Sequence, residues 1–313
     1  MNERQSVSSM PRFHAGLLHP RYWPTWLGLA LFRLFSLLPI AIIDAVAGAL
    51  GKGFYRINAK RVRFAHANLM QCFPELSSDE RDEIVKQHFV HQMRSVMHYG
   101  LIWWSSRRRL ESMIDLQGAE LVAQARAAGK NVIALTSHSV GLEFSVTAMG
   151  LNWECSGPYK PMKNALIDWM VAGGRTRFAV KAFARSDGLR PIIKDTRAGR
   201  LMIYLADEDL GRDNSVFASF FAAQKATLPV LARLVKNCNA VVIPCSSCYD
   251  VRRHQYVVKL YDIIEGFEDH DELDSAEHMN RAIERTVNEC IPQYFWTLRL
   301  FKTRPEGEPN IYA

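Results

Sequence analysis

Residues 131–138 read NVIALTSH, and this short stretch decides the fold. The apolar run follows Gly129 and Lys130 and stops at a serine-rich corner that carries His138, a pattern typical of a buried strand. A helix is expected directly after this corner, over about 141–149. The stretch therefore predicts a strand-to-helix unit, with His138 at the point where the strand ends.

The same rhythm of helix and apolar strand recurs along the rest of the chain. Helices are predicted over 79–104, 119–129, 190–198, 227–237 and 275–290, and strands over 200–207, 239–247 and, more exposed, 254–264. This alternation predicts an α/β fold with a mixed, largely parallel sheet flanked by helices. Because no internal repeat is evident, residues 57–313 are predicted to form one cytosolic domain.

Composition narrows the class of protein. The chain has 313 residues, of which 48% are hydrophobic and 23% charged, so a large core is available and disorder is excluded as the main state. The six cysteines show no disulfide framework. The net charge of +7 indicates an anionic partner, which could be a nucleic acid, an anionic lipid or a phosphorylated substrate. Nucleic acid is disfavoured because no reader motif is present.

The N-terminal region, residues 1–56, is predicted to be a membrane anchor. Residues 23–50 read WPTWLGLALFRLFSLLPIAIIDAVAGAL and contain only two charged residues. No other stretch is long and apolar enough for a span, so a polytopic membrane protein is excluded. Pro39 should divide the stretch into helices near 23–38 and 40–54.

Three arrangements of this stretch are open. A single tilted transmembrane helix over about 22–43, a helix pair lying in the membrane interface, and a buried core helix pair all fit an apolar segment with two charges. Trp23 and Trp26 at the start favour the membrane, as belt aromatics. The denser cluster of basic residues after the stretch predicts that the body lies on the cytoplasmic side.

His138 and Glu143 form a candidate catalytic pair. Strand ends of open α/β sheets are where ligands bind, and a carboxylate on one imidazole nitrogen leaves the other nitrogen as a base. The two side chains can meet if His138 lies on the loop and Glu143 in the first turn of the next helix. The alternative is a helix cap and a surface carboxylate.

Five collinear blocks resemble a known family. TSHSVGLE at 136–143 is similar to the His-x4-acidic motif of glycerolipid and lysophospholipid acyltransferases. The other blocks resemble the late acyltransferases of lipid A biosynthesis, the lauroyl and myristoyl transferases. They are NLMQCFPELSSDER (68–81), YKPMKNALIDWMVAGGRTR (159–177), YLADEDLGRDNSVFASFF (204–221) and PQYFWTLRLFKTRPEGEPNIY (292–312).

The resemblance implies a reaction and its partners. This family moves a fatty acyl group, here expected to be of the C12–C14 class, from acyl carrier protein to a hydroxyl of a Kdo-bearing lipid A precursor at the bacterial inner membrane. His138 would be the base, Glu143 would hold the imidazole, and Arg175 would stabilise the oxyanion. No metal or organic cofactor is expected, because the thioester is already activated.

Further residues are substrate-binding candidates. The 159–177 block contributes Tyr159, Lys160 and Asn164 by resemblance. Asp207 and Asp209 follow a strand end, so they could bind substrate hydroxyls, lock Arg175 or simply cap a turn. A last group is basic and suited to the phosphates or acidic sugars of an acceptor: Arg299, Lys302 and Arg304.

Other readings of the site are weaker. The PCSSC segment at 244–248 has no preceding His-x-Glu, so zinc is disfavoured. Ser137 and Ser139 lie outside any Gly-x-Ser-x-Gly elbow, which favours direct attack on the thioester over an acyl-serine intermediate. Two alternatives remain: the same chemistry on another glycolipid or a lipoamino acid, and an inactive lipid-binding relative.

Overall fold

A seven-stranded sheet forms the centre of the protein in the computed structural model, which describes residues 10–267 and 271–313. In spatial order its strands are β1 (Ile114–Gln117), β9 (Gln255–Leu260), β8 (Ala240–Asp250), β2 (Asn131–Thr136), β5 (Leu201–Leu205), β3 (Cys155–Tyr159) and β4 (Val180–Ala184). Every neighbouring pair is parallel except β8 and β9. The predicted mixed, largely parallel sheet is confirmed.

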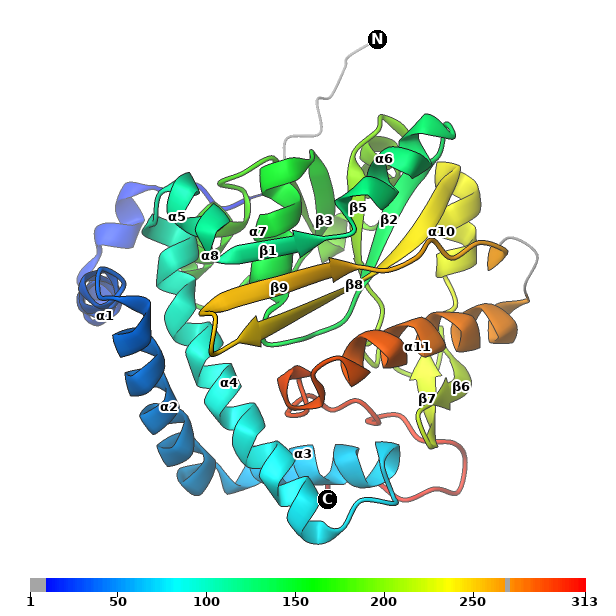
Figure 1. Cartoon of the computed structure of the whole chain (residues 1–313), viewed down its shortest axis with the longest axis horizontal. Helices are drawn as coiled ribbons and strands as arrows, with labels where there is room; N and C mark the ends of the chain where they lie inside the picture. Colours follow the sequence, from blue (N-terminus) through cyan, green and yellow to red (C-terminus); the bar gives the residue numbers. More distant parts are fainter. Residues whose placement is uncertain (1–9, 268–270) are drawn as a thin grey trace.

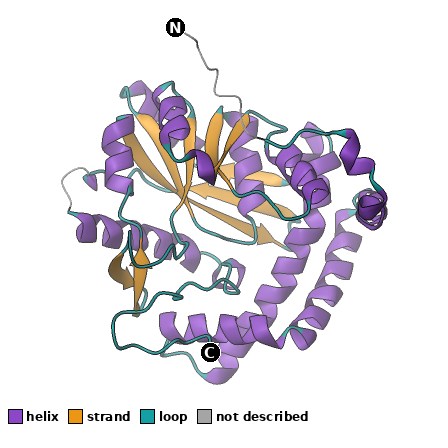
Figure 2. Cartoon of the chain, turned by 180° about the vertical axis from the view of Figure 1, so that it is seen from behind, coloured by secondary structure: helices purple, strands orange, loops and turns teal. Residues whose placement is uncertain are grey.

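Helices cover both faces of this sheet, as Figures 1 and 2 show from opposite sides. Within β2, Ile133 and Leu135 pack into one core, whereas Val132 and Ala134 pack into the other. This alternation is why the strand reads as a continuous apolar run: both of its faces are buried. The first core contains side chains of α3 (Ala59–Cys72), α4 (Ser78–Trp104), α9 (Arg190–Arg197), α10 (Leu231–Cys238) and α11 (Glu272–Asn288), and the second those of α6 (Ala119–Ala127) and α7 (Leu142–Asn152).

The predicted helices and strands are all present, with shifts of a few residues at their ends. Others were not predicted. They are β1, β3, β4, the hairpin of β6 (Val216–Phe220) and β7 (Ala223–Thr227), α3, α5 (Arg107–Ser112) and α8 (Ala165–Arg175). The strand β3 reads CSGPY, and glycine and proline both weaken a strand signal, so only its neighbours in the sheet hold it extended.

The N-terminal apolar stretch forms two helices, α1 (Trp23–Phe35) and α2 (Ile40–Ile57), divided at Pro39 as predicted. The continuous helix expected over 22–43 is not formed, because α1 ends at Phe35 and has 13 residues, a length of about 20 Å against the roughly 30 Å of a hydrocarbon core. Among the described residues, no helix has the length and apolar character needed to cross a membrane. Residues 1–9 of the predicted anchor region lie outside the described residues.

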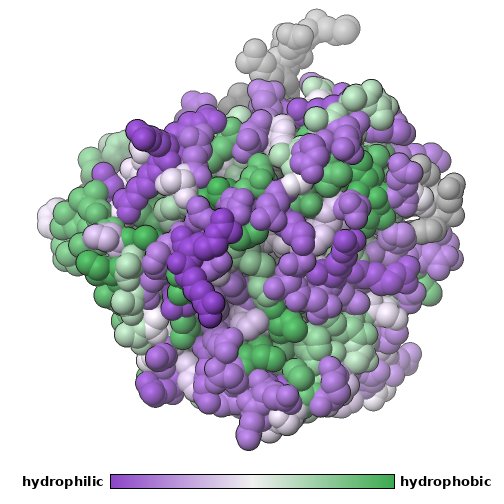
Figure 3. Space-filling model, viewed as in Figure 1, coloured by the Kyte–Doolittle hydropathy of each residue, from purple (hydrophilic) through white to green (hydrophobic). Residues whose placement is uncertain are grey.

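These two helices are buried on one side and exposed on the other. Gly51 of α2 lies against the backbone of Val90 in α4, where a Cβ atom would come within 2.6 Å of the Val90 Cα. On the opposite side, large apolar side chains face outward, and Figure 3 shows them gathered at the left edge over α1. They include Trp23, Leu27, Leu31, Leu34 and Leu37 of α1 and its end, and Ile42, Val46 and Leu50 of α2.

The C-terminal segment is part of the core and holds the loop that carries His138. Tyr294, Trp296 and Phe301 are buried. The backbone N–H of Phe295 donates to the carbonyl of His138 at 2.9 Å, and that of Val140 donates to Gln293 at 2.8 Å. The 292–312 block thus has a structural role, which is to fix the loop after β2.

One disulfide joins Cys248 in β8 to Cys290 after α11, a link that the cysteine spacing did not predict. The other four cysteines, including Cys245 of the PCSSC segment, are free and buried. The disulfide therefore ties the end of β8 to the start of the C-terminal segment.

Candidate active site

His138 and Asp207 form the centre of the site, at the carboxyl ends of two adjacent strands. Thr136 of β2 pairs with Leu205 of β5, so the residues two positions further along each strand lie side by side. Asp207 accepts twice from His138: its Oδ1 lies 2.7 Å from Nδ1, and its Oδ2 lies 2.7 Å from the backbone nitrogen. The ring is thereby oriented with Nδ1 as the donor, which leaves Nε2 as the acceptor.

Burial and charge act in opposite directions on this pair. Burial alone would lower the pKa of His138, but the negative charge and hydrogen bond of Asp207 raise it above its usual value. Burial would raise the pKa of Asp207, yet His138 holds it below the usual range. Since Asp207 is fully buried and its side chain has 0% exposure, it stays a carboxylate only because its oxygens are satisfied.

Glu143 does not hold the imidazole, and this corrects the predicted pair. It lies in the first turn of α7, where Arg175 at the end of α8 binds it with two nitrogens. Arg175 Nε is 2.9 Å from Oε1 and 3.0 Å from Oε2, and Nη2 also donates to Oε1. Burial opposes the charge of Arg175, but Glu143 raises the arginine's pKa. Asp207 was expected to bind substrate hydroxyls, lock Arg175 or cap a turn. Its partner in the structure is His138.

A cavity of about 430 Å³ is lined by His138 and by both members of the Glu143–Arg175 pair. Its lining combines polar and charged side chains with apolar side chains of the sheet and α7. Its lining includes His138, Glu143, Lys160, Arg175, Lys181, Arg185 and Glu208, and the apolar Leu142, Val146, Pro158, Met162, Ile203, Leu205 and Leu298. A substrate in this cavity would therefore have access to both the imidazole and the guanidinium.

The three candidates of the 159–177 block have different positions. Lys160 lines the cavity. Tyr159 is buried, donates its hydroxyl to Asp168 and lies under Arg175, whose guanidinium carbon is 5.9 Å from the ring centroid. Asn164 caps α8, accepting from the backbone of Leu166 at 3.0 Å. Tyr159 and Asn164 thus position α8 and its arginine.

Asp209 and the three basic candidates of the C-terminal block do not line this cavity. Asp209 accepts from the backbone and hydroxyl of Thr303, at 2.5 and 2.8 Å, so it anchors the C-terminal segment. Arg304 donates to Gln71 at 3.2 Å and pairs with Glu308. Arg299 stacks over Phe64 at 5.0 Å, and Lys302 is exposed. Leu298 is the residue of this segment that reaches the cavity.

Three residues that sequence reasoning missed lie around the site. Arg185 and Glu208 form an ion pair that lines both this cavity and an adjoining apolar cavity of about 280 Å³. Lys225 of β7 is fully buried, and burial lowers its pKa although Asp207 and Asp209 oppose this. Lys225 follows a glutamine in a stretch with no strand pattern, so no local signal marked it.

In the described part of the chain, no group of three or more histidine, cysteine or acidic side chains is arranged so that it could hold a metal ion. What the cavity offers is an imidazole base, a buried carboxylate that orients it, and a cation held in place nearby. Fold and cavity together define an α/β enzyme whose site lies at the carboxyl edge of its sheet, where such folds bind their ligands.

Comparison with known proteins gives the family. The sequence model described as bacterial lipid A biosynthesis acyltransferase matches residues 10–303. A lipid A biosynthesis acyltransferase of Haemophilus influenzae is 33% identical over 95% of this chain and 93% of its own. The lipid A biosynthesis myristoyltransferase and lauroyltransferase of Escherichia coli are each 32% identical, over 99% and 98% of this chain and 96% and 100% of their own. The chain belongs to the lipid A biosynthesis acyltransferase family.

Proposed function

We propose that the protein transfers a fatty acyl chain of the C12–C14 class from acyl carrier protein to a hydroxyl of a Kdo-bearing lipid A precursor. The observation that carries this proposal is the shared cavity, whose lining includes both a histidine oriented by a buried carboxylate and an arginine held by Glu143. Family membership supplies the reaction class, and the cavity supplies groups suited to it.

In this scheme His138 Nε2 takes the proton from the acceptor hydroxyl as the oxygen attacks the thioester carbon. Asp207 holds Nδ1 as a donor and stabilises the imidazolium that forms. General base catalysis by His138 contributes a factor of roughly 10²–10⁴ to the rate. The thiolate then leaves and takes a proton from the imidazolium. Both substrates are present together, and no acyl-enzyme forms.

Arg175 is the proposed donor to the oxyanion of the tetrahedral intermediate, and Glu143 is the residue that positions it. Nε and Nη2 of Arg175 both donate to the Glu143 carboxylate, which fixes the guanidinium plane before substrate arrives. A preorganised donor of this kind contributes about 3–4 kcal/mol. Arg175 retains this role because its side chain is 26% exposed, on the cavity side.

The adjoining apolar cavity is the proposed site of the acyl chain. Its wall is formed mainly by apolar side chains, among them Leu189, Ile192, Leu210, Leu228 and Val230. Arg185 and Glu208 stand at its border with the polar cavity. This arrangement would leave the thioester near His138 and the hydrocarbon tail away from water.

The exposed apolar side of α1 and α2 is the proposed contact with the cytoplasmic leaflet of the inner membrane. Leu27, Leu31 and Leu34 are 63%, 59% and 62% exposed, so burying them in the interfacial region is favourable. This arrangement anchors the enzyme without a span and lets the lipid acceptor reach the site from the leaflet.

The test uses the purified full chain with acyl-loaded carrier protein and the Kdo-bearing precursor. The wild type should form the acylated product, and His138→Ala should lower turnover by about 10²–10⁴-fold with an unchanged thermal unfolding profile. Near-normal turnover in that variant would contradict the mechanism.

A second measurement addresses the acceptor and the absence of an acyl-enzyme. Mass spectrometry of lipid A from a deletion strain should show one fewer acyl chain. Incubation with labelled donor alone should leave the mass of the protein unchanged. A competent adduct on Ser137, Ser139 or a cysteine would replace direct attack with a two-step transfer.

A further inference from the structure

A second cavity, far in sequence from the catalytic residues, lies between α2 and α4. It has a volume of about 570 Å³ and is open to solvent. Four of its lining side chains are basic and one is acidic: Lys52, Arg56, Lys86 and Arg94 against Glu83. The groove therefore carries an excess of positive charge that the catalytic scheme does not use.

Two of these four basic side chains have no ion-pair partner among the described residues. Of the other two, Lys86 pairs with Asp82 at 2.7 Å and Arg94 with Asp44 at 3.7 Å. Lys52 and Arg56 are exposed and make no ion pair or hydrogen bond in that part of the chain. His91 at the wall of the groove keeps a buried Nδ1 without a partner among the described residues.

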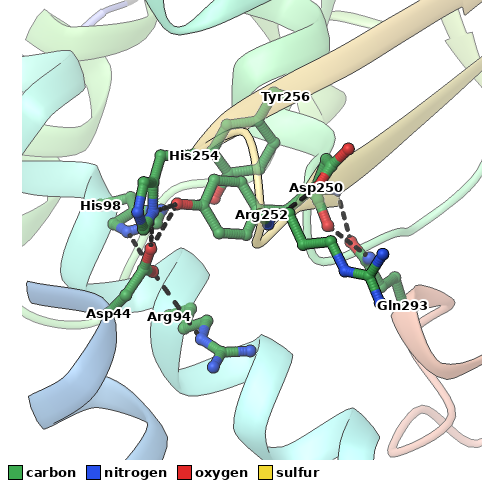
Figure 4. A network of polar contacts seen from close by, with 9 residues as sticks. Asp44, Arg94, His98, Asp250, Arg252, His254, Tyr256 and Gln293 are labelled. Carbon is green, nitrogen blue, oxygen red and sulfur yellow. Dashed lines mark hydrogen bonds and ion pairs between the residues drawn. The ribbon is translucent and has the colours of Figure 1, made fainter. Parts of the chain in front are cut away.

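Asp44 is the ion-pair partner of Arg94, which also lines the groove. Its Nε lies 3.7 Å from Asp44 Oδ1, and its side chain is only 17% exposed. Figure 4 shows its terminal nitrogens directed away from Asp44 and from the other residues of that network. No hydrogen bond occupies those nitrogens in the described residues. A partly buried guanidinium whose terminal nitrogens are not engaged suits the oxygens of a phosphate.

The surroundings of the groove indicate which kind of phosphate it meets. Ile42, Val46 and Leu50 form an exposed apolar stripe along α2, at a spacing of four residues. Lys52 and Arg56 lie on the flank of the same helix, between this stripe and the side that contacts α4. Basic side chains beside an apolar stripe place their charges at headgroup depth when the stripe enters a membrane.

We propose that the α2–α4 groove binds the headgroup phosphate of an anionic glycerophospholipid, such as phosphatidylglycerol. Lys52 and Arg56 approach the phosphate from the membrane side, and Arg94 and His91 from the protein side. The site is separate from the acyl-transfer cavity. It rests on the proposed function in one respect, namely that α1 and α2 contact the leaflet.

The test measures binding of the full chain to sedimented vesicles in the absence of carrier protein and precursor. Vesicles of phosphatidylcholine alone report on the apolar surface, and vesicles with one quarter phosphatidylglycerol add the phosphate site. The double variant Lys52→Gln/Arg56→Gln should bind the mixed vesicles about 30-fold more weakly, because each basic side chain at an anionic surface contributes about fivefold. Its binding to phosphatidylcholine should not change.

Two controls separate a phosphate site from general surface charge. The variant Lys60→Gln/Arg63→Gln loses the same charge from exposed positions of α3 that do not line the groove. It should lose at least tenfold less affinity than the groove variant on the mixed vesicles. Vesicles in which oleate supplies the same charge without a phosphate should show a much smaller effect of the groove variant.

Equal losses in the two double variants, or equal losses on phosphatidylglycerol and oleate vesicles, would overturn the proposal. Competition by millimolar glycerol phosphate that removes the phosphatidylglycerol increment would assign the groove to a soluble phosphate instead, and would also overturn it. If the wild-type chain does not bind phosphatidylcholine vesicles, the proposed membrane contact of α1 and α2 is contradicted. Turnover in detergent tests the transfer reaction independently.

Discussion

Two clusters of the molecule pair a histidine with an aspartate at nearly the same distance, yet only one of them faces a cavity suited to catalysis. His138 Nδ1 lies 2.7 Å from Asp207, and His254 Nδ1 lies 2.6 Å from Asp44. Asp207 has His138 as its one imidazole partner. Asp44 also accepts from Tyr249 at 2.6 Å and lies 3.2 Å from His98 Nε2 and 3.7 Å from Arg94 Nε (Figure 4).

The pKa values of His98 and His138 are shifted in opposite directions. His98 is fully buried, and burial lowers its pKa although Asp44 opposes the change. Asp207 prevails over burial at His138, whose pKa is raised. A carboxylate shared among several donors locks α2 to α4 and to the β8–β9 hairpin. A carboxylate with a single imidazole partner, on a histidine that lines a cavity, produces a base. A histidine–aspartate pair is therefore a poor marker of catalysis by itself. What distinguishes the two clusters is whether the histidine lines a cavity and how many imidazoles share the carboxylate.

The largest difference between the clusters should appear in turnover. Asp207→Asn replaces the acceptor of the Nδ1 proton with an amide, which favours the wrong tautomer, so kcat should fall by about 10²–10⁴-fold. Asp44→Asn should leave kcat within about threefold of wild type. Steady-state kinetics with the carrier-linked donor measures both, and comparable losses in the two variants would remove the distinction.

The structural role of the Asp44 network should appear in stability. Asp44→Ala leaves Arg94, His98 and His254 around a lost carboxylate, so unfolding should become easier by about 3–5 kcal/mol, as for broken buried ion pairs. Urea unfolding followed by tryptophan fluorescence gives this value. As a milder control, Asp44→Asn retains hydrogen bonding and should lose less. An unchanged urea midpoint in Asp44→Ala would mean that the network does not hold α2 in place.

Arg175 provides a test within the catalytic cluster. Lysine keeps the charge but cannot bind Glu143 in a fork, so Arg175→Lys should lower kcat by roughly 10–100-fold, less than loss of a complete oxyanion donor. Glu143→Gln should act through the same arginine and therefore add little in the double variant. Additive losses would indicate that Glu143 has a separate role.

The smallest effect is a shift in the pH profile. The base must be neutral to act, and Asp207 raises the pKa of His138, so the acidic limb of kcat/KM should lie above the usual histidine value of about 6.5. Asp207→Asn removes that charge while burial remains, so the residual activity should retain its value to lower pH. The limb of Asp44→Asn should match that of the wild type. A limb in Asp207→Asn that coincides with wild type would assign it to another group.

The sequence located His138 and much of the sheet, because a buried strand is a local apolar run and its end is visible as a change of composition. It also marked Glu143, Arg175 and Asp207 as residues of the site. It assigned the wrong partner to His138, since Glu143 is close in sequence and Asp207 is 69 residues away. Likewise, the apolar stretch 23–50 predicted helices and a break at Pro39, but not that α2 would bury one side against α4.

What the sequence by itself determined is therefore the set of helices and strands that carry a strong period, the family, and the chemical groups of the site. Only the tertiary structure decided which of those groups meet. His138 reaches Asp207 because β5 lies beside β2 in register, and Glu143 reaches Arg175 because α8 ends next to α7. Local period is set by the residues of one element, whereas the order of neighbours depends on which faces are buried together, a property of the whole chain.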